Sequence, residues 1–267
     1  MGADPANALA RPQELTLPEA RSWHGATYDR LSSPMEAMGR EVLERLELRG
    51  DETVIDAGCG SGRVTEALLA RVPRGRVIGV DASASMIDAA RERLGDRVAL
   101  HVADLTSLHL GLRADAILST ATFHWIADHD ALFARLRAHL RPGGALVAQC
   151  GAVGNIAGVH AAAREVMALE PYAPHFEGWR GPWNFAAPSE TERRLRDAGF
   201  AQARASLVER DVTPQDAHAY LSEINLGAHL DLLPDDLHAA FVDAVIERLG
   251  GAPVTIDYVR LNIDAVA

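Results

Sequence analysis

The chain contains no lysine, so all 26 basic residues among its 267 residues are arginines. This excludes the phosphate-binding loop of ATP- and GTP-binding proteins, because that loop requires a Gly-Lys-Ser/Thr sequence. The 37 acidic residues outnumber the arginines and give a formal net charge of −11. A nucleic-acid substrate is disfavoured by this charge, because phosphates are bound by basic surfaces. Together with the many alanines and glycines, the absence of lysine suggests a GC-rich bacterial genome.

Cysteine is also scarce, with only Cys59 and Cys150 in the chain. Two distant cysteines form neither a metal motif nor a disulfide framework, and the histidines show no ligand spacing, so we predict no metal. No apolar run approaches the roughly 18 residues of a membrane span. The N-terminus lacks a charged leader with an apolar core, so we expect a cytoplasmic protein that binds no membrane. The sequence does not indicate the oligomeric state.

The chain length fits one α/β domain with an appended lid, or two small domains. Apolar runs alternate with amphipathic segments, which indicates a largely parallel sheet flanked by helices. The predicted strands span 53–58, 76–82, 98–103, 115–120, 144–150, 203–212 and 254–266. The predicted helices span 34–49, 61–72, 83–94, 128–140, 155–170, 189–198, 214–230 and 234–249. The last strand alternates with period two, which favours an antiparallel position.

Glycines alternate directly after the first predicted strand, at Gly58, Gly60 and Gly62. This order of strand, tight turn and helix lets a ligand approach the backbone, because glycine has no Cβ. A dinucleotide would need a third glycine at position 63, which is Arg63. Asp56 would also repel a pyrophosphate but suits a ligand with a positive end. S-adenosylmethionine carries an ammonium and a sulfonium and no phosphate, so it fits this turn better than NAD.

Two further strands also end in an acid, namely Asp81 and Asp104. Ligands bind at the carboxyl edge of open α/β sheets, where a carboxylate can accept both hydroxyls of a ribose. Asp81 is placed for the ribose of an adenosine, and Asp104 for its amino group, with Leu105 and Met86 against the ring. Aspartate also occurs as a turn and cap residue, but three such residues beside a glycine-rich turn favour a binding site.

These residues carry a family resemblance. The segments Val-Ile-Asp-Ala-Gly-Cys-Gly-Ser-Gly, Gly-Val-Asp-Ala-Ser and Arg-Pro-Gly-Gly resemble class I S-adenosylmethionine-dependent methyltransferases over roughly residues 50–150. The segments 23–30, 118–129 and 149–155 resemble the trans-aconitate methyltransferase branch. The resemblance implies a Rossmann-like, seven-stranded, mostly parallel sheet with an antiparallel last strand, flanked by helices and completed by a helical lid.

The resemblance and the element pattern together suggest four parts. We expect an N-terminal lid segment at 1–39, a cofactor-binding core at 40–154, a lid insertion at 155–188, and the rest of the core at 189–267. The cofactor is expected to contact residues from the strand ends and from the N-terminal segment. These are Tyr28, Asp56, Gly58, Cys59, Gly60, Asp81, Ala82, Met86, Ala103, Asp104, Leu105 and Thr120.

A small-molecule acceptor is expected beside the cofactor's methyl group. Aromatic residues are scarce, at 5% of the chain, yet five of them fall within 172–185. The candidate acceptor contacts are Trp125, Phe176, Trp179, Arg180 and Trp183. If the acceptor carries carboxylates, Arg180, Arg30 or Arg260 could bind them in a bidentate manner. An aromatic lid equally suits a flat, apolar acceptor, and core packing of this segment is an even alternative.

His124 is the candidate catalytic residue. A carboxylate acceptor is ionised at neutral pH and needs no base, whereas a hydroxyl acceptor would gain from one. The alternative is that His124 packs beneath the lid. The sequence thus predicts a methyltransferase that acts on oxygen of a small acid or a natural-product-like hydroxyl. Two alternatives stay open: an NAD-dependent oxidoreductase, and a non-catalytic relative that only binds the cofactor.

Overall fold

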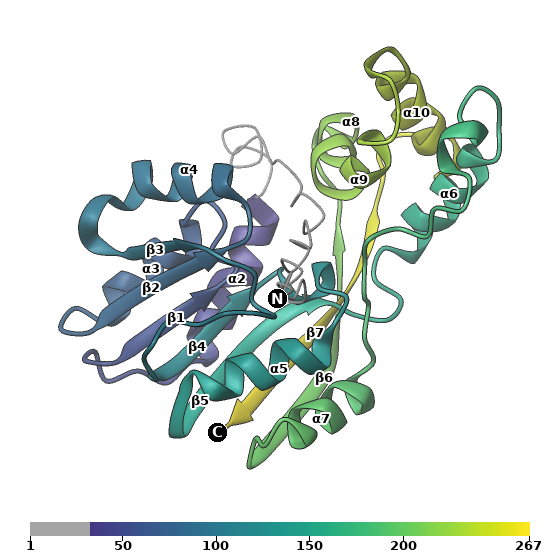
Figure 1. Cartoon of the computed structure of the whole chain (residues 1–267). Coiled ribbons are helices and arrows are strands. Elements are labelled where there is room, and N and C mark those ends of the chain that lie inside the picture. Colours follow the sequence, from purple (N-terminus) through teal and green to yellow (C-terminus); the bar gives the residue numbers. More distant parts are fainter. Residues whose placement is uncertain (1–32) are drawn as a thin grey trace, which may run out of the picture.

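A seven-stranded sheet forms the centre of the protein in the computed structural model, which describes residues 33–267. The strands follow the order β3-β2-β1-β4-β5-β7-β6 across the sheet (Figure 1). Their bounds are Thr53–Ala57 (β1), Arg76–Asp81 (β2), Ala99–Val102 (β3), Ala114–Thr120 (β4), Leu140–Gly151 (β5), Gln202–Val212 (β6) and Ile256–Val266 (β7). The paired strands from β3 to β5 are parallel, and β7 runs antiparallel to β5 and β6. The predicted fold class is confirmed.

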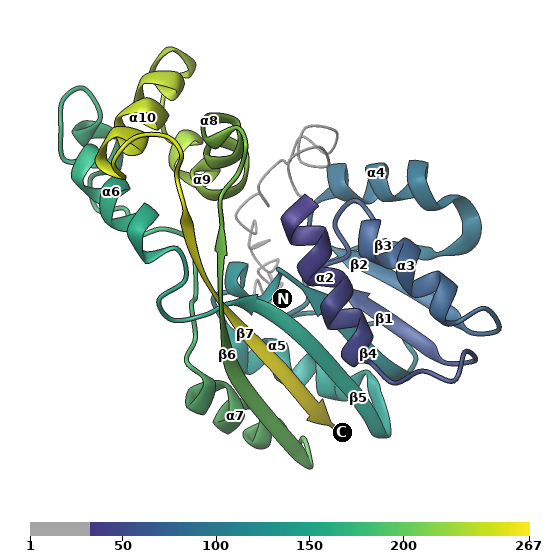
Figure 2. The same ribbon diagram turned by 180° about the vertical axis from the view of Figure 1, so that it is seen from behind.

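Helices cover both faces of this sheet, as the two opposite views show (Figures 1 and 2). One face carries α2 (Ser33–Arg45), α3 (Arg63–Arg71) and α4 (Ala84–Leu94), whose Leu43, Leu68 and Leu94 share an apolar cluster with Val54 and Val77. The other face carries α5 (His129–Ala138) and α7 (Pro188–Asp197), whose Phe133 and Leu195 pack with Ile55 and Ile117. The central strands are thereby buried on both sides, which explains their continuous apolar runs.

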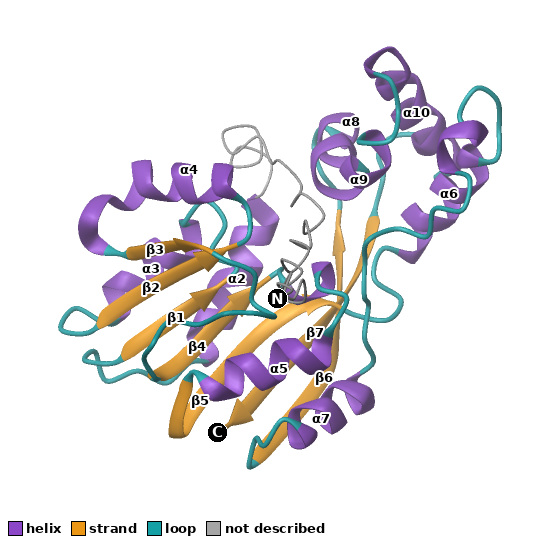
Figure 3. Cartoon of the chain, viewed as in Figure 1, coloured by secondary structure: helices purple, strands orange, loops and turns teal. Residues whose placement is uncertain are grey.

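A separate group of helices stands beyond the ends of β6 and β7 (Figure 3). We call it the helical cap. It consists of α6 (Ala157–Met167), a 3₁₀ turn (Ala173–Phe176), α8 (Ala217–Tyr220), a π turn (Leu221–Asn225), α9 (Gly227–Leu230) and α10 (Asp235–Arg248). These elements share their own apolar cluster, which includes Val159, Phe176, Tyr220 and Phe241. The cap therefore joins two segments that β6 separates in the sequence.

The helices of the cap differ in detail from the sequence-based prediction. A single helix was predicted over 214–230, whereas the chain forms two short helices joined by the π turn Leu221–Asn225. Turns of this kind often occur at functional sites. The lid boundaries at 155–188 stay a proposal, because the structure packs that segment together with α8–α10. None of the helices within residues 33–267 is long and apolar enough to cross a membrane.

Glu52 fixes the turn that leads into β1. Its carboxylate accepts hydrogen bonds from the backbone N–H groups of Arg49, Gly50 and Asp51, at 2.7, 2.8 and 3.1 Å. Burial raises the pKa of Glu52, but hydrogen bonds to the charged form outweigh this effect and lower the pKa from 4.5 to about 2. The ionised carboxylate therefore stabilises the fold above pH 4.5, and this contribution is lost as the pH falls through about 2.

We expect Glu52→Gln to lower the free energy of unfolding at pH 7 by about 1–2 kcal/mol, because charge-assisted hydrogen bonds become neutral ones. Urea unfolding between pH 2 and pH 7 measures the effect. The loss should shrink toward pH 2, where the wild-type carboxylate is itself becoming protonated. Glu47→Gln, on the exposed surface of the same connection, is the matched control and should change little. Equal effects of the two substitutions would contradict the role of Glu52.

Candidate functional site

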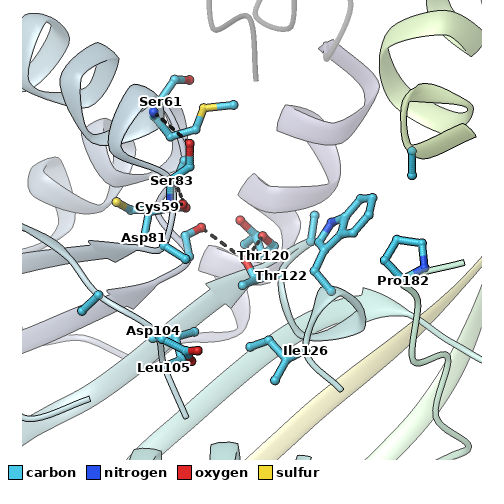
Figure 4. Close-up of a pocket in the computed structure, with 18 of the residues that line it drawn as sticks. Cys59, Ser61, Asp81, Ser83, Asp104, Leu105, Thr120, Thr122, Ile126 and Pro182 are labelled. Carbon is cyan, nitrogen blue, oxygen red and sulfur yellow. Dashed lines mark hydrogen bonds between the residues drawn. The ribbon is translucent and has the colours of Figure 1, made fainter. Parts of the chain in front are cut away.

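A large cavity of about 1190 Å³ opens at the carboxyl edge of β1, β2 and β4. We call it the main cavity. Figure 4 shows Asp81, Asp104 and Thr120 along one side of it and Pro182 across from them. Ten of the predicted cofactor residues line it, namely Gly58, Cys59, Gly60, Asp81, Ala82, Met86, Ala103, Asp104, Leu105 and Thr120. Of the predicted acceptor residues, Trp125 and Trp179 line the same cavity.

The remaining predicted residues lie elsewhere. Tyr28 falls outside the described residues. Asp56 is buried beneath the glycine turn and is not part of the cavity wall. Phe176 packs in the core of the helical cap, and Arg180 is exposed and lines neither of the two cavities described here. His124 and Trp183 line a second, smaller cavity.

The glycine turn is held between the end of β2 and the segment that follows β4. Gly58 has a φ of 82°, and its N–H and that of Cys59 donate to the carbonyl of Val80, at 2.7 and 3.0 Å. A Cβ at position 58 would lie 2.0 Å from Oγ1 of Thr122. That hydroxyl donates to the carbonyls of Gly58 and Thr120. Position 58 therefore requires glycine both for its backbone angle and for this close approach.

Asp81 ties the glycine turn to the start of α4. Its carboxylate accepts one hydrogen bond from the N–H of Gly60 and another from the N–H of Ser83, both at 2.9 Å. Burial raises the pKa of Asp81, and these backbone hydrogen bonds lower it in part. Asp104 has a similar local role, because its Oδ1 accepts from the N–H and the hydroxyl of Thr106. Both carboxylates thus shape the cavity wall as well as face it.

Asp56 is only 1% exposed. Its Oδ2 accepts a hydrogen bond of 2.7 Å from the hydroxyl of Thr65, and its Oδ1 has no hydrogen-bond partner among residues 33–267. Burial raises its pKa from 3.8 to about 6, the Thr65 hydroxyl opposes that rise, and the neighbouring charge of Asp81 adds to it. Asp56 is therefore a buried carboxyl group, two residues before the first glycine of the turn, with only one of its oxygens hydrogen-bonded within the described residues.

A second cavity of about 50 Å³ adjoins the main one, and Met35, Ala121 and Trp125 line both. The other residues in its wall include His124, Asn155, Trp183, Asn225, Tyr258 and Arg260. Arg260, on β7, is only 4% exposed. Sequence reasoning named Arg260 only as one of three possible carboxylate ligands, and it did not find Asn225 or Tyr258. No local pattern marks these residues, because the fold brings them together from distant segments.

His124 sits in a ring of aromatic side chains, stacked on Phe185 at 5.9 Å between ring centroids. The backbone N–H of Gly151 donates to its Nδ1 at 3.2 Å. Burial, and then the charge of Arg260, hold the pKa of His124 well below 6.5, so the ring is neutral. Because Nδ1 is the acceptor, the ring proton of the neutral form is on Nε2. This arrangement makes His124 a hydrogen-bond donor toward a ligand and gives no support to the role of a base.

Within residues 33–267, no group of three or more His, Cys, Asp or Glu side chains is placed to hold a metal ion. Residues 54–144 match the family model described as "Methyltransferase domain". The matched residues contain the glycine turn, Asp81, Asp104 and the first cavity-lining aromatic, Trp125.

Curated proteins named trans-aconitate 2-methyltransferase are similar to this chain. The one from Paracidovorax citrulli is 31% identical over 256 residues, covering 90% of this chain and 94% of that protein. The one from Azoarcus is 38% identical over 128 residues, covering 48% of this chain and 50% of that protein. In the Azoarcus comparison, the chain therefore spans about half the length of its relative.

A solved structure shows the same fold. Phosphoethanolamine N-methyltransferase 2 from Haemonchus contortus, in complex with S-adenosyl-L-methionine, has a TM-score of 0.57 and 17% identity with this chain. The similarity covers 90% of this chain and 56% of that one.

We expect Gly58→Ala to weaken binding of S-adenosylhomocysteine at least tenfold, because the new Cβ would push the turn away from Thr122 into the cavity. Isothermal titration calorimetry measures the affinity. Gly111→Ala is the matched control, since Gly111 also has a positive φ, of 66°, but has no atom within 4 Å of a new Cβ. If both variants lose affinity equally, backbone strain and not the contact with Thr122 is responsible.

We expect binding of S-adenosylhomocysteine near pH 6 to release about half a proton per site, because the ligand's ammonium favours the ionised form of Asp56. Calorimetry in two buffers with different ionisation enthalpies counts the protons. Asp56→Asn should abolish the release, whereas at pH 8 the wild-type protein should release none from this group. A release that persists in Asp56→Asn would assign the proton to another residue.

The glycine turn, the acids at three neighbouring strand ends, the matching family model and a relative aligned over nearly the whole length of both chains agree with one another. The chain belongs to the class I S-adenosylmethionine-dependent methyltransferases, and its cofactor is S-adenosylmethionine.

Proposed function

We propose that this protein transfers the methyl group of S-adenosylmethionine to an oxygen atom of a small organic acid. The observation that carries the proposal is the shape of the binding region. One cavity is lined by a glycine turn, acidic strand ends and two tryptophans, and it adjoins a second cavity whose wall includes a buried arginine. Cofactor and acceptor would therefore lie end to end.

The cofactor would lie along the carboxyl edge of the sheet. Gly58, Cys59 and Gly60 would contact its methionine end, with the charge of Asp56 beneath the turn attracting the ammonium. Asp81 would accept hydrogen bonds from the ribose hydroxyls, and Asp104 from the adenine amino group. The apolar wall formed by Ala82, Met86, Ala103 and Leu105 suits the faces of the adenine ring. The sulfonium would then point toward Thr120 and Trp125.

Methyl transfer from a sulfonium is a one-step displacement in which the carbon–sulfur bond breaks as a carbon–oxygen bond forms. The leaving group is already good, so the enzyme mainly holds the two reactants in line and excludes water. Trp125 and Trp179, which line the cavity, would exclude water from the reacting atoms. An ionised carboxylate needs no base, which agrees with a His124 ring that carries its proton on Nε2.

The curated relatives support a carboxylate as the acceptor group, since the proteins from Paracidovorax citrulli and Azoarcus are named trans-aconitate 2-methyltransferases. At 31% identity over nearly the full length, the acceptor can still differ between the two proteins. A natural-product-like hydroxyl is the other acceptor class that an aromatic wall accommodates. The two classes differ in whether a base is needed, so the pH dependence of the reaction separates them.

We expect methyl-labelled cofactor to label trans-aconitate or a related small acid, with the label recovered as a base-labile ester. With saturating cofactor, the rate should be constant from about pH 6 to pH 9, because the carboxylate of the acceptor is fully ionised throughout this range. His124→Gln should lower kcat less than tenfold, whereas loss of a true base costs about 10²- to 10⁴-fold. A rate that rises toward pH 10 would instead indicate a hydroxyl acceptor. Tight cofactor binding without labelling of any acid or phenol would indicate a non-catalytic relative.

A further inference from the structure

We propose that the second cavity binds an anionic group of the acceptor that does not itself react, between Arg260 and His124. The inference rests on the proposed function, because it concerns the acceptor of the same reaction. Met35, Ala121 and Trp125 line both this cavity and the main one, so the two cavities adjoin. A group held there would be the far end of a molecule whose reacting oxygen lies in the main cavity.

The size of the second cavity limits what can enter it. Its volume of about 50 Å³ is comparable with the space of one or two water molecules, so a carboxylate fits and a ring does not. The adenine or the ribose of the cofactor is therefore excluded from this cavity. The aromatic side chains of Trp183 and Phe185 form part of the wall.

The charge of the wall favours an anion. Arg260 is 4% exposed and is permanently charged at any relevant pH, and its guanidinium carbon lies 5.9 Å from the ring centroid of Tyr258. A guanidinium in such a poorly solvated place attracts a carboxylate far more strongly than one on the surface. The same charge also holds down the pKa of His124, so the histidine stays neutral beside it.

Hydrogen-bonding groups in the wall complement the charge. Because Nδ1 of His124 is occupied by the Gly151 N–H, Nε2 is the nitrogen that remains to donate to a ligand. Asn225 is 4% exposed, and its Nδ2 donates to the hydroxyl of Tyr258 at 3.0 Å. Its Oδ1 has no hydrogen-bond partner among residues 33–267. A buried polar group without a partner is rare and points to a ligand that completes it, such as a hydroxyl next to the anion.

The backbone around the second cavity is unusual at three places. Within residues 33–267, Ala121 (φ 56°) and Ile156 (φ 47°) are the two non-glycine residues with a positive φ, and both line this cavity. The π turn Leu221–Asn225 contributes Asn225 to the same wall. Strained backbone persists where surrounding structure enforces it, and it concentrates at ligand-binding sites. Three such features around a cavity of this size support a built site and not a packing defect.

The experiment compares crotonate with glutaconate, which share the 2-enoate skeleton but carry one and two carboxylates. Each acid is titrated by calorimetry into the full-length protein saturated with S-adenosylhomocysteine. We expect glutaconate to bind the wild type at least tenfold more tightly than crotonate, because its second carboxylate reaches Arg260. Arg260→Gln should abolish this preference, a loss of about 10- to 100-fold in glutaconate affinity. Arg204→Gln, on the neighbouring strand β6, is the matched control and should retain it.

A second variant tests the inference independently, in case Arg260→Gln does not fold. Asn225→Asp has the same shape but adds a negative charge to the wall, and it should weaken glutaconate more than crotonate. The inference is overturned if the wild type does not prefer glutaconate or if Arg260→Gln retains the preference. It is also overturned if Arg260→Gln weakens S-adenosylhomocysteine itself, since Arg260 would then serve the cofactor. If the predicted preference is found but no acid is methylated, the inference stands and the proposed acceptor chemistry fails.

Discussion

The close approach between Gly58 and Thr122 is the contact on which the geometry of the binding region depends. A Cβ at position 58 would lie 2.0 Å from the Thr122 hydroxyl, so only glycine lets the turn after β1 lie against the segment after β4. Asp81 then fixes the other side of the turn through the N–H of Gly60. With both sides held, the backbone forms one wall of the main cavity, and the neighbouring segment carries Ala121 and Trp125 into the wall of both cavities.

The helical cap and the sheet together form the walls of the two cavities. The cap has its own apolar cluster, built from α6 and α8–α10, and it contributes Ala228, Asp231 and Leu232 to the main cavity and Asn225 to the second. The strands β6 and β7 extend toward the cap (Figure 1). Arg260 of β7 lines the second cavity together with Asn225 of the cap. In the proposed arrangement, the cofactor side of the binding region would be made by the sheet, and the acceptor side jointly by sheet and cap. This division lets a family keep one cofactor and vary its acceptors.

The sequence was most informative where function is local. The order of strand, glycine turn and helix at 53–71 is a continuous pattern, so Gly58, Gly60 and the acids at the strand ends were found from spacing alone. It was less informative for the cap. A helical pattern over 214–230 does not reveal the π turn at Leu221–Asn225, because that turn follows from tertiary packing of Leu221 and Leu226 in the cap core. His124 was identified as a notable residue, but its tautomer depends on the N–H of Gly151.

By itself, the sequence determined the seven-stranded class of sheet and the cofactor through its family resemblance. It also determined the glycine turn and the acidic strand ends that line the main cavity, because apolar periodicity and turn chemistry act over a few neighbouring positions. Only the tertiary structure decided that Asp56 is buried and that His124, Asn225 and Arg260 meet around one small cavity. These three residues are separated by up to 136 positions in the chain. Their meeting depends on the antiparallel placement of β7 beside β5 and on the packing of the cap, which no short sequence pattern encodes.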